Sequence, residues 1–253
     1  MSYFIAITGK GGVGKTTISA LIVNRLINRG RKPVLAIDAD PNTCLDALLG
    51  VKAEKTVGRV REEVREIAGK GLAAGISKQE LLEMKIAESL VESDNFDLIA
   101  MGRSEGPGCY CYANNVLKSV INEISGNYPY IVLDNEAGLE NLSRRIVQEV
   151  DILIIASDPS NRGVETVRRL YELSKEMGIR YKKLVLIINR IRNEHLPEAA
   201  HELKKAANAD ILVSLPEDDE IIDLSEGSQV ITGLKENNPV LKSIDELLDK
   251  LGL

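Results

Sequence analysis

Residues 9–16 of the chain read GKGGVGKT and fit the phosphate-binding pattern G-x-x-x-x-G-K-[ST]. Glycines let the backbone turn tightly, so that successive N–H groups point inward at phosphate oxygens. We expect Lys15 to reach the β- and γ-phosphates and the Thr16 hydroxyl to bind Mg²⁺. The loop therefore predicts a site for a nucleoside triphosphate and Mg²⁺. Its predicted contact residues are Gly9, Gly11, Gly12, Val13, Gly14, Lys15, Thr16 and Thr17.

Three aspartates follow apolar runs elsewhere in the chain. Asp38 and Asp40 belong to the sequence DADPN at 38–42, and Asp134 ends the sequence IVLD at 131–134. One such aspartate alone would be an ordinary turn residue. Open α/β sheets bind their ligands at the carboxyl ends of the strands, where all three aspartates are expected. Asp134 is therefore predicted to hold Mg²⁺ through a bound water, because Mg²⁺ keeps much of its hydration, and Asp38 is predicted to support the ion.

Two cysteines one residue apart, Cys109 and Cys111, lie in the sequence GPGCYCYAN at 106–114. Two thiolates do not complete a soft-metal site, which usually takes four ligands. A twofold homodimer would supply the missing pair, because an isologous interface places the same loop opposite itself. We therefore predict a shared site for Ni²⁺ or Zn²⁺. Cys44 has no such neighbour and is predicted to pack in the core.

Short apolar runs alternate with segments of helical periodicity. The runs are rich in Ile, Val and Leu with almost no polar alternation, which is typical of parallel strands buried on both faces. They predict an α/β fold, a doubly wound and mostly parallel sheet of about seven or eight strands flanked by helices, in one P-loop NTPase domain over residues 1–253. The predicted strands are Phe4–Thr8, Pro33–Ile37, Asp97–Met101, Tyr130–Leu133, Ile152–Ala156, Leu184–Ile188 and Ile211–Leu215.

Three further segments have helical patterns. Apolar residues between Val164 and Met177 recur at helical spacing. Residues 51–95 are charged and are predicted to form one or two helices packed on the edge of the sheet. Residues 239–253 predict a C-terminal helix with one leucine-rich stripe. Its polar face is acidic, which suits docking on the protein and disfavours anchoring in a membrane.

Composition limits the classes of partner. The chain has 253 residues, 32 basic against 38 acidic, and a formal charge of −6. An acidic chain has no global electrostatic attraction to nucleic acid or to an anionic membrane, so neither is expected as a partner. The apolar runs are too short to span a bilayer, and no secretory signal is visible, so we expect a cytoplasmic protein. With two Phe and no Trp, its core must be aliphatic.

A second lysine in the loop, Lys10, makes the motif resemble the deviant Walker A subclass, K-G-G-x-G-K-[ST]. The resemblance implies that Lys10 reaches across a dimer interface to the partner's nucleotide, so that Lys10, Lys15 and Asp40 are the catalytic residues, with Asp40 orienting the attacking water. It also implies that the Gly138 amide meets the γ-phosphate. Asn189 and Pro216 would contact adenine, and the absence of N-K-x-D after this asparagine favours ATP and ADP over guanine nucleotides.

The sequences DADP at 38–41 and DNEAGLE at 134–140, together with the C-x-C pair, resemble the CooC-type nickel-insertion ATPases. These are accessory proteins of carbon monoxide dehydrogenase and acetyl-CoA synthase. The resemblance implies a homodimeric, ATP-dependent metallochaperone whose client is that nickel enzyme.

Two other functions stay open. An ATP-dependent electron donor with an iron–sulfur cluster, like nitrogenase iron protein, would also place cysteines across a dimer axis. That family takes its second cysteine from a separate loop, and the segment after Asp134 has none. A positioning ATPase of the MinD or ParA type would need a basic face or a basic amphipathic tail, and neither is visible in the sequence.

Overall fold

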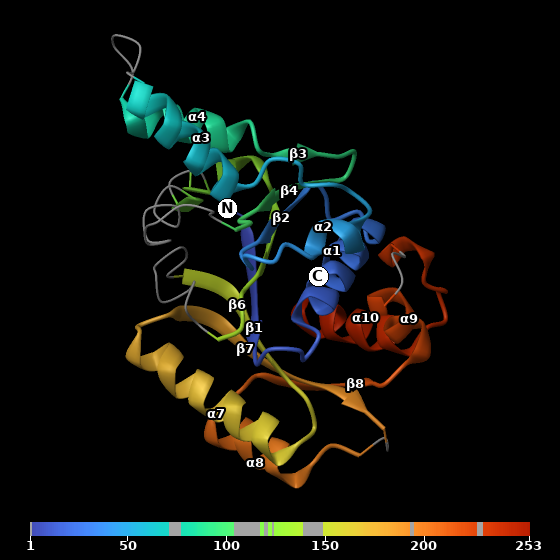
Figure 1. Ribbon diagram of the computed structural model, residues 1–253. Helices are drawn as coiled ribbons and strands as arrows, with labels where there is room; N and C mark the ends of the chain where they lie inside the picture. The colour runs from blue at the N-terminus through green and yellow to red at the C-terminus, as the bar shows by residue number, and fades with distance from the viewer. Residues whose placement is uncertain are drawn as a thin grey trace.

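An eight-stranded sheet forms the centre of the computed structural model (Figure 1). The structure describes residues 2–70, 77–103, 117–118, 121–122, 124–138, 149–192, 195–226 and 230–253. The strand order is β3-β4-β2-β5-β1-β6-β7-β8, and every neighbouring pair is parallel except β3 with β4. The bounds are β1 Tyr3–Gly9, β2 Val34–Asp38, β3 Val91–Glu92, β4 Phe96–Ala100, β5 Tyr130–Asp134, β6 Glu149–Ser157, β7 Arg180–Ile191 and β8 Ile211–Pro216.

The predicted fold class is confirmed, and each of the seven predicted strands is present. The one strand that the sequence pattern did not indicate is β3, which has two residues and pairs antiparallel at the edge of the sheet. A strand that short contains no readable periodicity.

Helices cover both faces of the sheet. They are α1 Lys15–Asn28, α2 Leu45–Leu49, α3 Val57–Lys70, α4 Lys78–Ala87, α7 Asn161–Glu176, α8 Glu198–Ala206, α9 Asp219–Glu226 and α10 Pro239–Leu251, with 3₁₀ turns at Ser125–Asn127 and Ile231–Gly233. One core cluster joins the sheet to α3, α4, α7 and α8, and a second joins it to α1, α2, α9 and α10. Within the described residues, no helix is long and apolar enough to cross a membrane.

Each central strand sends alternate side chains to these two clusters. In β6, Leu153 and Ile155 pack in the cluster of α3 and α7, whereas Ile152 and Ile154 pack in the cluster of α1 and α10. Successive residues of a strand point to opposite faces, so a strand covered on both sides needs apolar residues at every position. This is why the predicted strands lack polar alternation.

The charged segment 51–95 forms the helix pair α3 and α4 near the β3 edge of the sheet, as predicted (Figure 1). Val57, Val60 and Val64 of α3 are buried, and Leu82 and Ile86 of α4 join them in the same cluster. The other sides of both helices are mostly exposed.

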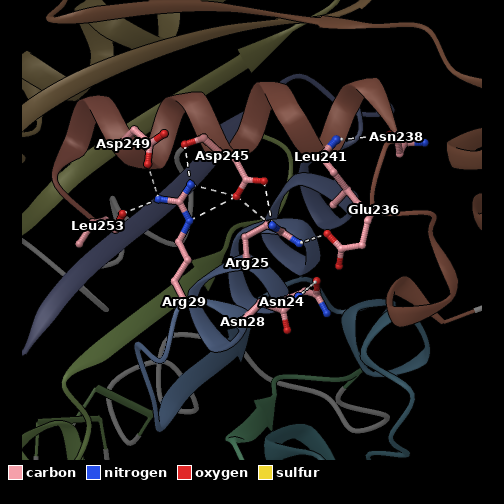
Figure 2. A network of polar contacts seen from close by, with 10 residues as sticks. All are labelled: Asn24, Arg25, Asn28, Arg29, Glu236, Asn238, Leu241, Asp245, Asp249 and Leu253. Atoms are coloured by element: carbon pink, nitrogen blue, oxygen red, sulfur yellow. Dashed lines mark hydrogen bonds and ion pairs between the residues drawn. The ribbon is translucent and has the colours of Figure 1, made fainter.

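The predicted C-terminal docking helix is α10, which lies against α1 (Figure 2). Its stripe of Leu241, Ile244, Leu247, Leu248 and Leu251 is buried. Beside the stripe, Asp245 accepts hydrogen bonds from Arg25 Nε at 2.9 Å and Arg29 Nη2 at 3.0 Å, and its second oxygen lies 2.9 Å from Arg25 Nη2. Arg29 also donates to Asp249 and to the backbone oxygen of Leu253. The end of the chain is therefore fixed to the helix that begins at the phosphate-binding loop.

We expect Asp245→Asn to lower the free energy of unfolding by about 1–2 kcal/mol, because two half-buried guanidinium groups lose their shared carboxylate. Urea unfolding at neutral pH measures the change. Asp249→Asn is the matched control, since its side chain is 69% exposed, and we expect it to cost less than about 0.5 kcal/mol. Equal effects of the two substitutions would contradict a central role for Asp245.

Candidate nucleotide site

The phosphate-binding loop connects β1, the strand between β5 and β6, to α1. Gly9 lies so close to β6 that a Cβ atom there would be 2.2 Å from the Ala156 oxygen. Gly14 precedes α1 with φ 89°, a left-handed conformation that favours glycine. No described side chain caps α1, and its first turn has no acidic residue. The positive end of the α1 dipole therefore faces the loop without a capping carboxylate, as a phosphate site requires.

Lys15 is buried at the start of α1, with 7% of its surface exposed. Its Nζ donates to the Lys10 carbonyl oxygen at 3.2 Å, inside the loop. Burial lowers the pKa of Lys15, and the carboxylates of Asp134, Asp40 and Glu136 act in the opposite direction. This lysine is thus held close to the loop backbone, where its charge can meet a phosphate.

Asp134 is the fully buried residue at the end of β5. Ser19 donates to its Oδ1 at 3.1 Å, whereas Oδ2 has no hydrogen-bond partner among the described residues. Burial and the neighbouring Asp38 raise the pKa of Asp134 to about 7, against the lowering effect of Thr16, Ser19 and Lys15. An orphaned carboxylate oxygen beside a threonine hydroxyl fits a divalent cation. Asp134 and Thr16 would hold Mg²⁺, which would neutralise phosphate charge.

Asp38 lies opposite Asp134 in the register of β2 and β5. Both of its oxygens accept backbone N–H groups, Oδ1 from Asp40 at 3.0 Å and Oδ2 from Cys44 and Leu45, each at 3.0 Å. Burial raises the pKa of Asp38 to about 6, although these hydrogen bonds oppose it. Asp38 therefore stabilises the turn into α2, and its predicted support of Mg²⁺ stays a prediction.

The prediction that Cys44 packs in the core is wrong, because its side chain is exposed. The backbone N–H groups of Cys44 and Leu45 both point at Asp38, and this anchors the start of α2. The same geometry buries Leu45 completely and leaves the preceding thiol outside.

Asp40 is half-buried at the same edge of the sheet. Its Oδ1 accepts the backbone N–H of Asn42 at 2.8 Å and the Nδ2 group of Asn42 at 2.9 Å. One carboxylate oxygen is thus fixed within the turn. The role of Asp40 in orienting water stays a prediction.

The segment after Asp134 is bonded to the end of β1. Asn135 Nδ2 donates to the Ile7 oxygen at 2.8 Å, and the Gly138 N–H donates to the Gly9 oxygen at 3.1 Å. The Thr8 hydroxyl donates to the Gly138 oxygen. The predicted contact of the Gly138 amide with a γ-phosphate therefore requires the bond to Gly9 to open.

The two residues predicted to contact adenine, Asn189 and Pro216, line one cleft together with Gly14 and Thr17. Asn189 Nδ2 donates to the Val13 oxygen at 2.8 Å, so the end of β7 also holds the loop in place. This cleft adjoins the start of α1, where a base would lie if the phosphates occupied the loop.

Lys10 has a partner that the sequence did not indicate. Its Nζ lies 3.7 Å from Asp158 Oδ2, and 45% of the lysine side chain is exposed. Burial would raise the pKa of Asp158, but hydrogen bonds from Ser160 and the charge of Lys10 lower it. Asp158 follows β6 at the same edge of the sheet as Asp38 and Asp134, and that position was the signal that could have identified it. The predicted reach of Lys10 to a partner subunit stays a prediction.

Cys109 and Cys111 lie outside the described residues. Arg103 is the last described residue before them, just after β4. In the part of the chain that the structure describes, no group of three or more His, Cys, Asp or Glu residues could hold a metal ion.

Comparison with known proteins identifies close relatives over the whole chain. Residues 2–187 match the family model described as an AAA domain. An uncharacterised ATP-binding protein of Methanocaldococcus jannaschii is 38% identical over 248 residues, which cover 98% of this chain and 97% of that protein. The carbon monoxide dehydrogenase accessory protein CooC of Rhodospirillum rubrum is 29% identical over 229 residues, 86% of each chain. The MinD cell division protein of Aquifex aeolicus has a similar structure, with a TM-score of 0.70, 25% identity, and 99% of this chain and 97% of that one covered.

The buried Asp134 predicts a pH dependence of stability. Its pKa of about 7 in the folded chain lies above the value of about 4 in an unfolded chain, so the folded state binds the proton more tightly. Its contribution to stability is therefore full below about pH 4 and is lost as the pH rises through about 7. In nucleotide-free, Mg²⁺-free protein, we expect Asp134→Asn to reduce this pH-dependent loss of the free energy of unfolding by about 1 kcal/mol or more.

Urea unfolding at pH 5 and pH 8 measures this difference. Asp94→Asn is the control, because it makes the same change of charge at an exposed position. Identical pH dependence in the wild type and Asp134→Asn would show that Asp134 does not titrate in this range.

Proposed function

The chain belongs to the AAA domain family, within the P-loop ATPases of the deviant Walker A type. From this premise we propose that it is an ATP-dependent metallochaperone. In this proposal a homodimer binds Ni²⁺, or Zn²⁺, at a C-x-C site formed by Cys109 and Cys111 of both protomers. It delivers nickel to carbon monoxide dehydrogenase or acetyl-CoA synthase.

ATP hydrolysis is the activity of this family, and the chain is an ATPase. We assign the phosphates to the loop and Lys15, and Mg²⁺ to Thr16 and Asp134. Asp40 orients a water whose oxygen bonds to the γ-phosphorus while the bond to the β,γ-bridging oxygen breaks, which gives ADP and phosphate. Lys10 of the partner subunit stabilises the charge that develops on the leaving oxygen.

The single observation that supports the proposal is the position of Arg103, the last described residue before the C-x-C pair. Arg103 lies just after the carboxyl end of β4, and β4 pairs with β2, which ends at Asp38. The chain therefore leads toward Cys109 and Cys111 from the same edge of the sheet as the phosphate-binding loop. The similarity to CooC of Rhodospirillum rubrum supports nickel as the cargo.

Nucleotide and metal would be coupled through closure of the dimer. ATP at both loops would bring two C-x-C pairs together, and hydrolysis would loosen the dimer and release the metal. Linkage makes this coupling reciprocal: if ATP tightens metal binding, the metal must tighten ATP binding by the same factor.

A positioning ATPase of the MinD type is the second candidate, because the Aquifex aeolicus MinD structure matches this chain over its whole length. Two features argue against it. The chain has a net charge of −6, and the apolar stripe of α10 is buried against the protein. ATP-dependent retention on anionic liposomes or on DNA at moderate salt would favour this candidate.

Replacing both Cys109 and Cys111 with Ser should reduce the bound Ni²⁺ per dimer toward zero, because each protomer loses both thiolates. Elemental analysis after dialysis against Ni²⁺ and ATP measures the stoichiometry. Cys44→Ser is the matched control, since it removes an exposed thiol elsewhere. One tightly held metal per dimer in the double variant would show that the proposed ligands are wrong. Iron with broad visible absorption after anaerobic purification would favour a cluster instead.

We expect Lys10→Ala to lower kcat by about 10³-fold or more, as loss of a charge-neutralising finger does in phosphoryl transfer. The free energy of unfolding should be unchanged, because 45% of the Lys10 side chain is exposed. Lys52→Ala, at a side chain that is 82% exposed, is the control. Unchanged turnover in Lys10→Ala would remove this role.

A mixing experiment separates action across the interface from action within one subunit. Consider a dimer of one Lys10→Ala and one Asp40→Ala protomer. If Lys10 acts on the partner's nucleotide, one of the two sites contains both an intact Lys10 and an intact Asp40. If Lys10 acts within its own subunit, neither site does. In the first case, an equal mixture should regain about a quarter of wild-type turnover by random pairing. If the mixture stays inactive, Lys10 acts within its own subunit.

A further inference from the structure

The three residues after β4 are fixed between the end of β2 and the start of α3. The Met101 N–H donates to the Asp38 oxygen at 2.7 Å, and the Gly58 N–H donates to the Met101 oxygen at 2.8 Å. Gly102 has φ 62°, and a Cβ atom there would lie 2.2 Å from Thr56 Oγ1. Only glycine fits this position without displacing Thr56. The backbone therefore places Arg103 in a defined location beside the Asp40 turn.

Arg103 reaches Asp40 through one intermediate side chain. Its Nη2 donates to Asn42 Oδ1 at 2.6 Å, and Asn42 Nδ2 donates to Asp40 Oδ1 at 2.9 Å. The Asn42 backbone N–H donates to the same Asp40 oxygen at 2.8 Å. The contact joins residues 61 positions apart in the chain.

The guanidinium group selects the orientation of the Asn42 amide. An arginine only donates hydrogen bonds, so it can bind the oxygen of the amide and not its NH₂ group. With the oxygen turned to Arg103, the NH₂ group faces Asp40. Asn42 is exposed, so once Arg103 is removed only the hydrogen bond to Asp40 opposes rotation of the amide into water.

We propose that Arg103 is a positioning residue of the hydrolysis site and holds Asp40 in place through Asn42. The inference rests on the proposed function, because it takes Asp40 as the residue that orients water. A displacement of Arg103 would therefore be transmitted to Asp40 through two hydrogen bonds, one from Arg103 to Asn42 and one from Asn42 to Asp40.

The test compares Arg103→Ala, Arg103→Lys, Asn42→Ala and the double variant of Arg103→Ala with Asn42→Ala. We expect Arg103→Ala to lower kcat by about three- to tenfold with little change in KM, because it weakens the placement of Asp40 and leaves the phosphate contacts intact. Arg103→Lys should recover part of the loss, since an ammonium group can also donate to Asn42. Arg59→Ala, an exposed arginine at the nearby start of α3, is the control and should keep wild-type kcat.

The double variant distinguishes action through Asn42 from an independent effect. If both residues act through one contact, the double variant has the kcat of the more impaired single variant. If the two losses multiply, or if Arg103→Ala keeps wild-type kcat, the positioning role is wrong. Urea unfolding of each variant excludes loss of the fold as the cause.

Asp40→Ala separates this inference from the proposed function. If Asp40→Ala keeps wild-type kcat, the proposed role of Asp40 in orienting water fails. If Asp40→Ala loses turnover while Arg103→Ala keeps wild-type kcat, only the positioning role of Arg103 fails.

Discussion

The site depends on two aspartates that the register of β2 and β5 places side by side in a buried position. Asp38 and Asp134 are both fully buried, and the negative charge of Asp38 adds to burial in raising the pKa of Asp134. The protein stabilises them in different ways. Three backbone N–H groups surround Asp38, whereas Asp134 keeps one oxygen without a described partner. Burial of a carboxylate without a partner is costly, so this asymmetry would favour a cation at Asp134, whereas Asp38 holds the backbone.

The phosphate-binding loop is held by the strands on both sides of β1. Gly9 packs directly on β6 and accepts the N–H of Gly138 after β5, while Asn189 at the end of β7 binds the Val13 oxygen. These contacts fix the loop before any ligand binds, and preorganised groups contribute more to binding and catalysis than mobile ones. The Gly138 N–H already donates to the Gly9 oxygen, so this hydrogen bond would have to break before Gly138 could donate to a γ-phosphate.

Helix α1 is anchored at both ends. Its start carries Lys15 and Thr16, and its end carries Arg25 and Arg29, which bind the carboxylate of Asp245 in α10 (Figure 2). The C-terminal helix is therefore part of the frame that holds the nucleotide site. The apolar stripe of this amphipathic helix is buried against the protein, so the helix has no free apolar face with which to enter a membrane surface.

The phosphate-binding loop, the seven longer strands and the docking of the C-terminal helix could all be predicted from the sequence. These features follow from local pattern, because glycine conformation and the spacing of apolar residues are encoded by neighbours in the chain. Which polar side chains contact one another became clear only from the folded structure. The exposed thiol of Cys44, the pairing of Lys10 with Asp158, and the contact of Arg103 with Asn42 depend on the register and order of the strands. Packing of the whole sheet brings together residues that are far apart in the sequence, and a short sequence pattern cannot predict such contacts.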